Sequence, residues 1–114
     1  MDYSQLSDFE INKRVAQLHG GFALTLAVHD EPPSGKSFDP GRFDPCNNPA
    51  DAWPIISANR ISLMYDKSTE EGNEAQWCLA SSPCDQHIVD YVSESKLLRA
   101  AMIVFLMIQE NQNG

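Results

Sequence analysis

The chain has 114 residues, which is the usual length of one domain with one hydrophobic core, so residues 1–114 are expected to fold as a single domain. Its 42% hydrophobic and 21% charged residues exclude wholesale disorder. Sixteen carboxylates against eight Lys and Arg give a net charge of −8, which opposes binding to phosphate backbones. This charge either serves solubility or forms a functional acidic surface, such as one that mimics nucleic acid.

Three cysteines, Cys46, Cys78 and Cys84, are an odd set in a chain without a cationic and apolar leader. We therefore expect free thiols and a cytoplasmic protein. The apolar stretch 97–108 is shorter than the ~20 residues that cross a bilayer as a helix, so no membrane contact is expected.

The first predicted element is a helix over 7–19. Ser7 and Glu10 have the spacing of a capping box, and Gly20 and Gly21 end the apolar repeat. In the segment 22–28 large apolar residues alternate with Ala and Thr, which predicts a strand.

Prolines and glycines then predict a long loop over 29–48, a working surface or flexible tip. Asn48 followed by Pro49 predicts the start of a short helix that Pro54 restarts or kinks before Asn59. Trp53 is expected to anchor this helix to the core.

Two strands are predicted at 61–65 and 75–80, joined by the polar connection 66–74, and 87–92 is a candidate edge strand. The last helix is predicted to begin near Ser93 or Ser95 and to end at about Gln109, before a frayed tail over 110–114.

These elements predict an α+β fold. A three-stranded, mainly antiparallel sheet carries the N-terminal and C-terminal helices on one face, with the long Pro/Gly loop and the short central helix at one end. The last helix is apolar nearly all round and needs cover on more than one side. The first helix or a second copy could give this cover, and the second option predicts a homodimer through Met102, Phe105 and Leu106.

Chemical motifs are weak. Cys78, Cys84 and His87, with Cys46, could supply zinc ligands, but the five residues between Cys78 and Cys84 exceed the usual spacing. The acidic connection 66–74 does not fit a calcium-binding loop. No nucleophile motif or phosphate-binding loop is present, so no catalytic residue, metal or cofactor is predicted.

Aromatic residues are expected in the core, including Trp53, Trp77, Tyr65 and Phe22. Phe38 and Phe43 differ, because they lie among prolines and must fold back or contact a partner. Together with Trp53 they are the candidate partner surface.

Three segments resemble the NinX-like family of lambdoid phages and prophages: 4–15 (SQLSDFEINKRV), 43–63 (FDPCNNPADAWPIISANRISL) and 98–110 (LRAAMIVFLMIQE). They cover somewhat under half of the chain. Relatives are expected to carry Asn-Pro immediately before the last segment, where this chain has Lys96 and Leu97. The resemblance implies a small accessory protein of phage growth in a bacterial cytoplasm, and the family carries no assigned activity.

The predicted function is a non-catalytic protein-protein interaction module that binds a host or phage protein. One alternative is a nucleic-acid-binding domain, because the predicted order of elements is similar to double-stranded-RNA-binding domains and Lys96 and Arg99 begin the last helix. Eight scattered basic residues do not provide the basic face that RNA recognition needs, which weighs against that alternative. An undetected enzyme is the other alternative. An exposed Phe on a neutral or acidic face favours a protein partner, a basic face favours nucleic acid, and polar groups in a deep pocket favour catalysis.

Overall fold

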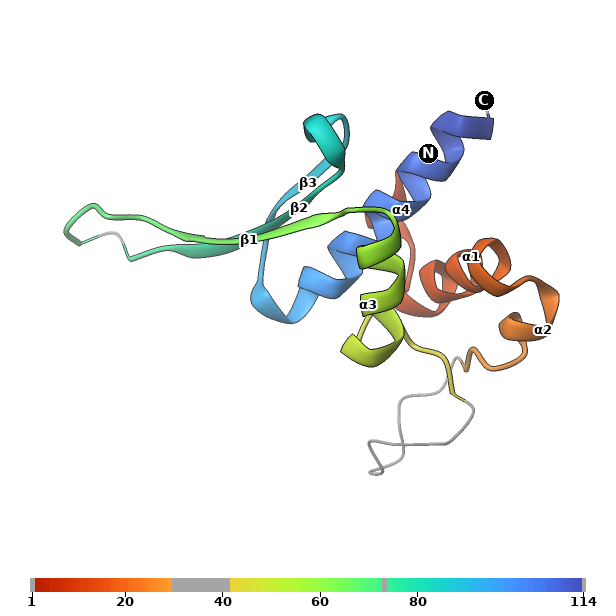
Figure 1. Cartoon of the computed structure of the whole chain (residues 1–114). Helices are drawn as coiled ribbons and strands as arrows, with labels where there is room; N and C mark the ends of the chain where they lie inside the picture. The colour runs from red at the N-terminus through yellow and green to blue at the C-terminus, as the bar shows by residue number, and fades with distance from the viewer. Residues whose placement is uncertain (1, 30–41, 73, 114) are drawn as a thin grey trace.

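The computed structural model describes residues 2–29, 42–72 and 74–113. A helical part and a three-stranded antiparallel sheet meet at the C-terminal helix, and the hairpin of the first two strands projects from the rest of the molecule (Figure 1). The α+β class predicted from the sequence is confirmed.

The N-terminal part begins with a short 3-10 turn, Tyr3–Gln5, followed by α1, Asp8–Gly20. The capping box at its start is formed as predicted. The Glu10 backbone N–H donates to Ser7 Oγ at 3.1 Å, and the Ser7 backbone N–H donates to the Glu10 carboxylate at 3.4 Å. Local capping therefore fixes where this helix begins.

The segment after α1 corrects the sequence prediction, because residues 22–28 do not form a strand. Gly21 adopts φ 75° and ψ −165°, a conformation open almost only to glycine, and the chain turns into a short helix, α2, Phe22–Thr25. Gly20 lets α2 approach closely, since a Cβ added there would lie 2.7 Å from Leu24 Cδ2. Phe22 and Leu26 are left 71% and 69% exposed.

The predicted long loop over 29–48 lies largely outside the described residues, and so does Phe38. Its last part, 42–48, leads into α3, Pro49–Ala58, which begins where the sequence predicts. Asn48 caps this helix by accepting from the Ala50 backbone N–H at 3.0 Å.

Polar bonds tie this segment to α1. Asn12 donates to Asp44 at 2.7 Å and accepts from the Cys46 backbone N–H at 3.0 Å. The Asp44 backbone N–H donates to the Asp51 carboxylate at 2.9 Å. The buried side chain of Asn12 therefore joins α1 to the start of α3 with both of its polar atoms satisfied.

The sheet has the order β1-β2-β3 and is antiparallel throughout, with β1 at Ser62–Lys67, β2 at Gln76–Ser81 and β3 at Ile88–Val92. The hairpin strands confirm the predictions at 61–65 and 75–80. The third strand is the candidate edge strand, not the segment 22–28. A bulge interrupts the pairing of β2 with β3 between Cys78 and Ala80.

A 3-10 turn at Glu94–Lys96 leads into α4, Leu97–Asn113. This helix continues to Asn113, beyond the predicted end at about Gln109. Glu110 is part of the reason, because its carboxylate accepts a 2.6 Å hydrogen bond from the Tyr3 hydroxyl.

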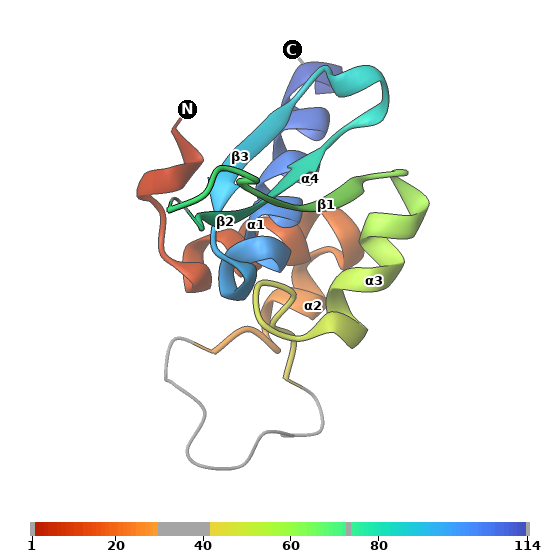
Figure 2. The ribbon, with the colours of Figure 1, turned by 90° about the vertical axis from the view of Figure 1, so that its left-hand side faces the viewer.

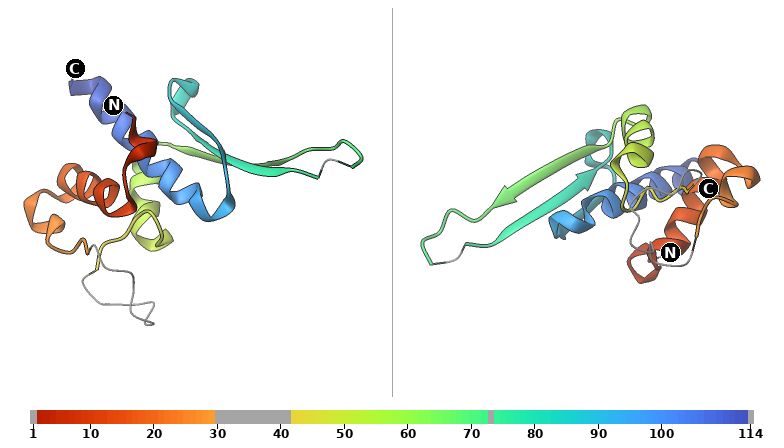
Figure 3. Two further views of the ribbon diagram at one scale, coloured as in Figure 1. Left: turned by 180° about the vertical axis from the view of Figure 1, so that it is seen from behind. Right: turned by 90° about the horizontal axis from the view of Figure 1, so that it is seen from below.

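The layers also differ from the prediction of both terminal helices on one sheet face. Among the described residues, the helix that packs most extensively on the sheet is α4, mainly against β2 and β3, while α1 packs on α4 (Figure 2). The hairpin projects away from the helices when the molecule is seen from behind or below (Figure 3). Helix α3 contacts α4 as well. Helix α4 is thus covered by the sheet, α1 and α3.

This arrangement removes the exposed surface on which the predicted dimer rests. Met102, Phe105 and Leu106 are 0%, 4% and 3% exposed within the single chain. They belong to one core cluster with Ile11 and Val15 of α1 and with Ala80 of β2. Self-association through these three side chains would require α1 or the sheet to leave α4. Within the described residues, no helix is both long and apolar enough to cross a membrane.

Candidate functional site: a groove beside the first and last helices

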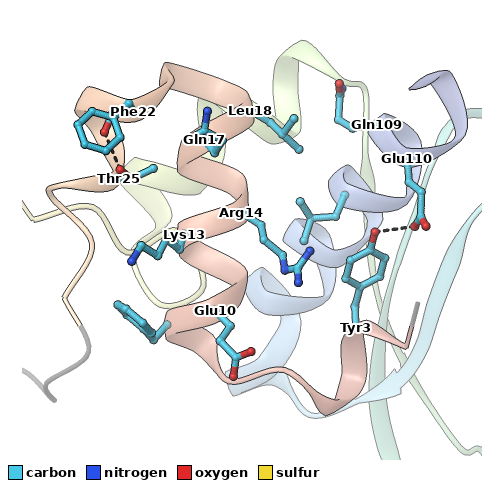
Figure 4. Close-up of a pocket in the computed structure, with 12 residues that line it drawn as sticks. Tyr3, Glu10, Lys13, Arg14, Gln17, Leu18, Phe22, Thr25, Gln109 and Glu110 are labelled. Atoms are coloured by element: carbon cyan, nitrogen blue, oxygen red, sulfur yellow. Dashed lines mark hydrogen bonds between the residues drawn. The ribbon is translucent and has the colours of Figure 1, made fainter. Parts of the chain in front are cut away.

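An open groove of about 620 Å³ lies between α1, α2, the N-terminal turn and the last turns of α4. Figure 4 shows α1 on one side, and Tyr3 with the end of α4 on the other. Five side chains give it an apolar lining: Tyr3, Phe9, Leu18, Phe22 and Leu106. A groove of this size and lining is suited to holding an apolar group.

Most polar side chains of the groove come from α1 and α4. Glu10, Lys13, Arg14 and Gln17 lie on α1, and Gln109 and Glu110 lie on α4. The Lys13 ammonium lies 5.2 Å from the centre of the Phe9 ring. Arg14 extends from α1 toward Tyr3 (Figure 4). Its guanidinium makes no hydrogen bond or ion pair with any described residue, so it is available to an anionic group.

Tyr3 is held at the far wall of the groove by its hydrogen bond to Glu110. Burial, followed by the hydrogen bond and the negative charge of Glu110, raises the pKa of Tyr3 to about 12. A phenol with a raised pKa stays protonated at neutral pH and is a poor base or nucleophile. The only other hydroxyl in the lining, Thr25 Oγ1, donates to the Phe22 carbonyl at 2.6 Å. This arrangement suits binding better than covalent chemistry.

Exposed apolar side chains continue from the groove onto the surface beside it. Leu18 and Phe22, which line the groove, are 47% and 71% exposed, and Leu26 just beyond α2 is 69% exposed. The sequence pattern does not predict this patch, because residues 22–28 alternate as a half-buried strand would. The only sequence signal is that these three residues recur every four positions.

Of the partner surface predicted from the sequence, the structure describes Phe43 and Trp53. Phe43 is buried and stacks on His19, with ring centroids 6.4 Å apart, so this phenylalanine folds back into the core. Phe38 lies outside the described residues. Trp53 is 63% exposed, so the expectation that it anchors α3 to the core is wrong, although its exposure leaves it accessible to a partner.

Two more aromatic residues expected in the core are also exposed. Phe22 belongs to the groove, and Tyr65 on β1 is 66% exposed. Trp77 is half-buried. The prediction of burial from aromatic character alone is therefore wrong for Phe22 and Tyr65, because burial depends on which elements pack over a side chain.

The three cysteines and His87, which the sequence offered as possible zinc ligands, are not grouped as a metal site in the structure. Cys46 and Cys78 are buried and Cys84 is exposed. Burial, and then the charge of Asp8, raises the pKa of the Cys46 thiol, which opposes formation of the thiolate that a metal would need. The described residues contain no group of three or more His, Cys, Asp or Glu side chains placed to hold a metal ion.

Arg99 has a structural role in place of the RNA contact considered from the sequence. Its guanidinium forms a 2.8 Å ion pair with Asp8 and donates to the backbone carbonyls of Leu6 and Ser4 at 2.7 Å and 3.3 Å. It therefore fastens the N-terminal segment to α4, and these bonds use three of its five N–H donors.

The fold and the groove describe a small α+β protein whose last helix is enclosed by a sheet and two helices, with an open, mainly apolar site at one end. The chain belongs to the phage family described as Bacteriophage P22, NinX, whose model matches residues 2–109. This confirms the resemblance found in the sequence. None of the curated proteins and none of the solved structures compared with the chain matches it.

Proposed function

We propose that the chain is a non-catalytic accessory protein of phage growth that binds a host or phage protein in the bacterial cytoplasm through the groove beside α1 and α4. The observation that carries this proposal is the exposed apolar patch of Leu18, Phe22 and Leu26 at the groove. Apolar side chains grouped on a surface and rimmed by polar residues are typical of protein interaction sites.

The side chains of the groove define the kind of partner segment. Its apolar lining favours an amphipathic helix that inserts aliphatic or aromatic side chains, as helix-in-groove complexes do. Arg14 favours a carboxylate on the same segment, because its guanidinium has no hydrogen bond or ion pair among the described residues. A small molecule would fit the volume, but it would leave Leu26, outside the lining, uncovered.

The charges of the groove weigh against a phosphate ligand. Lys13 and Arg14 are balanced by Glu10 and Glu110, so the groove offers no net positive charge to a nucleic acid. Two features weigh against catalysis: the raised pKa of Tyr3, and a lining without Ser, Cys or His.

The test is affinity capture from infected bacterial lysate with tagged wild-type protein and two single variants, after nuclease treatment. Phe22→Ser removes an exposed ring at the groove, and Trp53→Ser removes a comparably exposed ring on α3. We expect a stoichiometric protein that survives nuclease, binds the Trp53→Ser variant as it binds wild type, and is lost with Phe22→Ser.

The other outcomes contradict the proposal in distinguishable ways. Loss of the partner with Trp53→Ser and retention with Phe22→Ser would place the binding surface on α3. Loss of all captured material after nuclease would favour the nucleic-acid alternative. Direct binding of the recovered protein to Arg14→Glu, measured by calorimetry, tests the carboxylate contact, because charge reversal should weaken it about tenfold or more.

A further inference from the structure

The sheet presents a second surface, on the face that points away from α4. Opposite residues of antiparallel strands share a face, so the pairing of Met64 with Leu79 and of Asp66 with Trp77 places these four side chains together. Ala80, the residue after Leu79 on β2, points to the opposite face and belongs to the core cluster with α4. That face is therefore the inner face, and the face with Met64 and Trp77 is the outer one. Met64 is 50% exposed on this outer face.

An aromatic pair marks the outer face. Tyr91 of β3 lies next to Trp77 of β2, with ring centroids 5.5 Å apart and planes tilted by 35°. Tyr91 sits at the bulge where the pairing of β2 and β3 shifts, it has φ 55°, and it is 76% exposed. A bulky residue with positive φ is strained, and a bulge can redirect a side chain. Here the strained backbone holds a ring that solvent can reach.

The net negative charge of the chain is concentrated in the same region. Residues 62–94 carry seven carboxylates and one lysine, a net −6 of the −8 of the whole chain: Asp66, Glu70, Glu71, Glu74, Asp85, Asp90 and Glu94, against Lys67. All seven acidic residues are exposed.

Two of these carboxylate residues lie beside the aromatic pair. Asp66 is opposite Trp77, and Asp90 immediately precedes Tyr91. The surface thus combines an exposed ring, a half-buried ring, aliphatic side chains and negative charge.

We propose that this outer face, centred on Trp77 and Tyr91, binds a cationic segment of a partner protein. The faces of the two rings attract guanidinium or ammonium groups, and the surrounding carboxylates neutralise them. Met64 and Ile88, both about half exposed, cover the aliphatic stems of Arg or Lys side chains. The net charge of −6 disfavours a second copy of this face and a nucleic acid, because both would be repelled.

The experiment measures fluorescence anisotropy of a labelled peptide of alternating Arg and Leu, with a peptide of alternating Glu and Leu as the control probe. We expect saturable binding of the Arg peptide that weakens with salt, and no binding of the Glu peptide. Tyr91→Gly should raise the Kd by about tenfold or more. Glycine tolerates φ 55°, so the thermal midpoint should be kept or raised, and loss of binding cannot be attributed to unfolding.

A matched pair of double variants separates a specific site from general attraction. Asp66→Asn with Asp90→Asn, and Glu70→Gln with Glu71→Gln, change the net charge equally, but only the first pair lies beside the rings. We expect the first pair to weaken binding several times more than the second. Equal effects of the two pairs, an unchanged Kd in Tyr91→Gly, or no binding of the Arg peptide by wild type would each overturn the proposal. Phe22→Ala, in the groove of α1, should leave this Kd unchanged.

Discussion

The two regions that meet at α4 bury their side chains in different ways. On the helical side, α1 places Ile11, Val15 and Ala16 against α4 and adds polar bonds through Asn12. On the sheet side, one face packs on α4, while the opposite face and the hairpin remain exposed. The helical side thus holds most of the long-range side-chain hydrogen bonds, and the sheet side carries most of the net negative charge. The same central helix therefore supports one region built for packing and one that leaves a large surface available.

The largest expected effect comes from replacing a buried methionine by glutamate, and the same substitution is compared in both regions. Met102→Glu places a carboxylate at a position that is 0% exposed, and we expect it to cost about 5 kcal/mol or more, enough to unfold the chain. Met64→Glu, on the outer sheet face, should leave the fold intact. Circular dichroism during thermal unfolding measures both. A folded Met102→Glu variant would show that α4 is not enclosed as described.

The next effect tests the attachment of the N-terminal segment to α4. Arg99→Ala removes the ion pair with Asp8 and two hydrogen bonds to backbone carbonyls, so the free energy of unfolding should fall by about 2 kcal/mol. Arg99→Lys should recover only part of this loss, because an ammonium cannot reproduce the planar fork. Lys67→Ala on the exposed hairpin is the control, with an expected change within about 0.5 kcal/mol in urea unfolding.

A smaller effect appears at alkaline pH on the helical side. The pKa of Tyr3 is raised from 10.0 to about 12 by burial and by its bond to Glu110. The folded state therefore holds this proton more tightly, so the contribution to stability is complete below pH 10.0 and is lost as the pH rises through about 12. Tyr3→Phe should reduce this decline in unfolding experiments, and should remove the latest step from the tyrosinate absorbance titration. An unchanged titration would contradict the burial of Tyr3.

The alkylation rates of the cysteines compare how well both regions exclude solvent, without altering the stability of the protein. Cys46 in the helical part and Cys78 on the inner sheet face are buried, whereas Cys84 after β2 is exposed. Alkylation of the native protein followed by mass spectrometry should therefore give rapid modification of Cys84 alone, and denaturant should expose the other two. Cys84→Ser should abolish the rapid step. Rapid modification of Cys78 would show that the sheet separates from α4 under native conditions.

Several elements follow from local signals in the sequence. The capping box at Ser7, the Asn48-Pro49 pair and the polar connection between two apolar runs specify α1, the start of α3 and the hairpin. Each signal acts over a few residues, through a side-chain cap, a fixed φ angle or a turn, so it does not depend on distant parts of the chain. The family resemblance is also carried by the sequence alone.

Only the tertiary structure decides which faces are covered. Residues 22–28 alternate like a strand, yet Gly21 turns the chain into α2 and leaves Phe22 exposed. The three apolar side chains of α4 that suggested a dimer are buried because α1, α3 and the sheet all pack on this helix. Phe43 is buried and Trp53 exposed for the same reason. Burial depends on contacts between residues far apart in the chain, and one hydrophobic pattern is compatible with several of them.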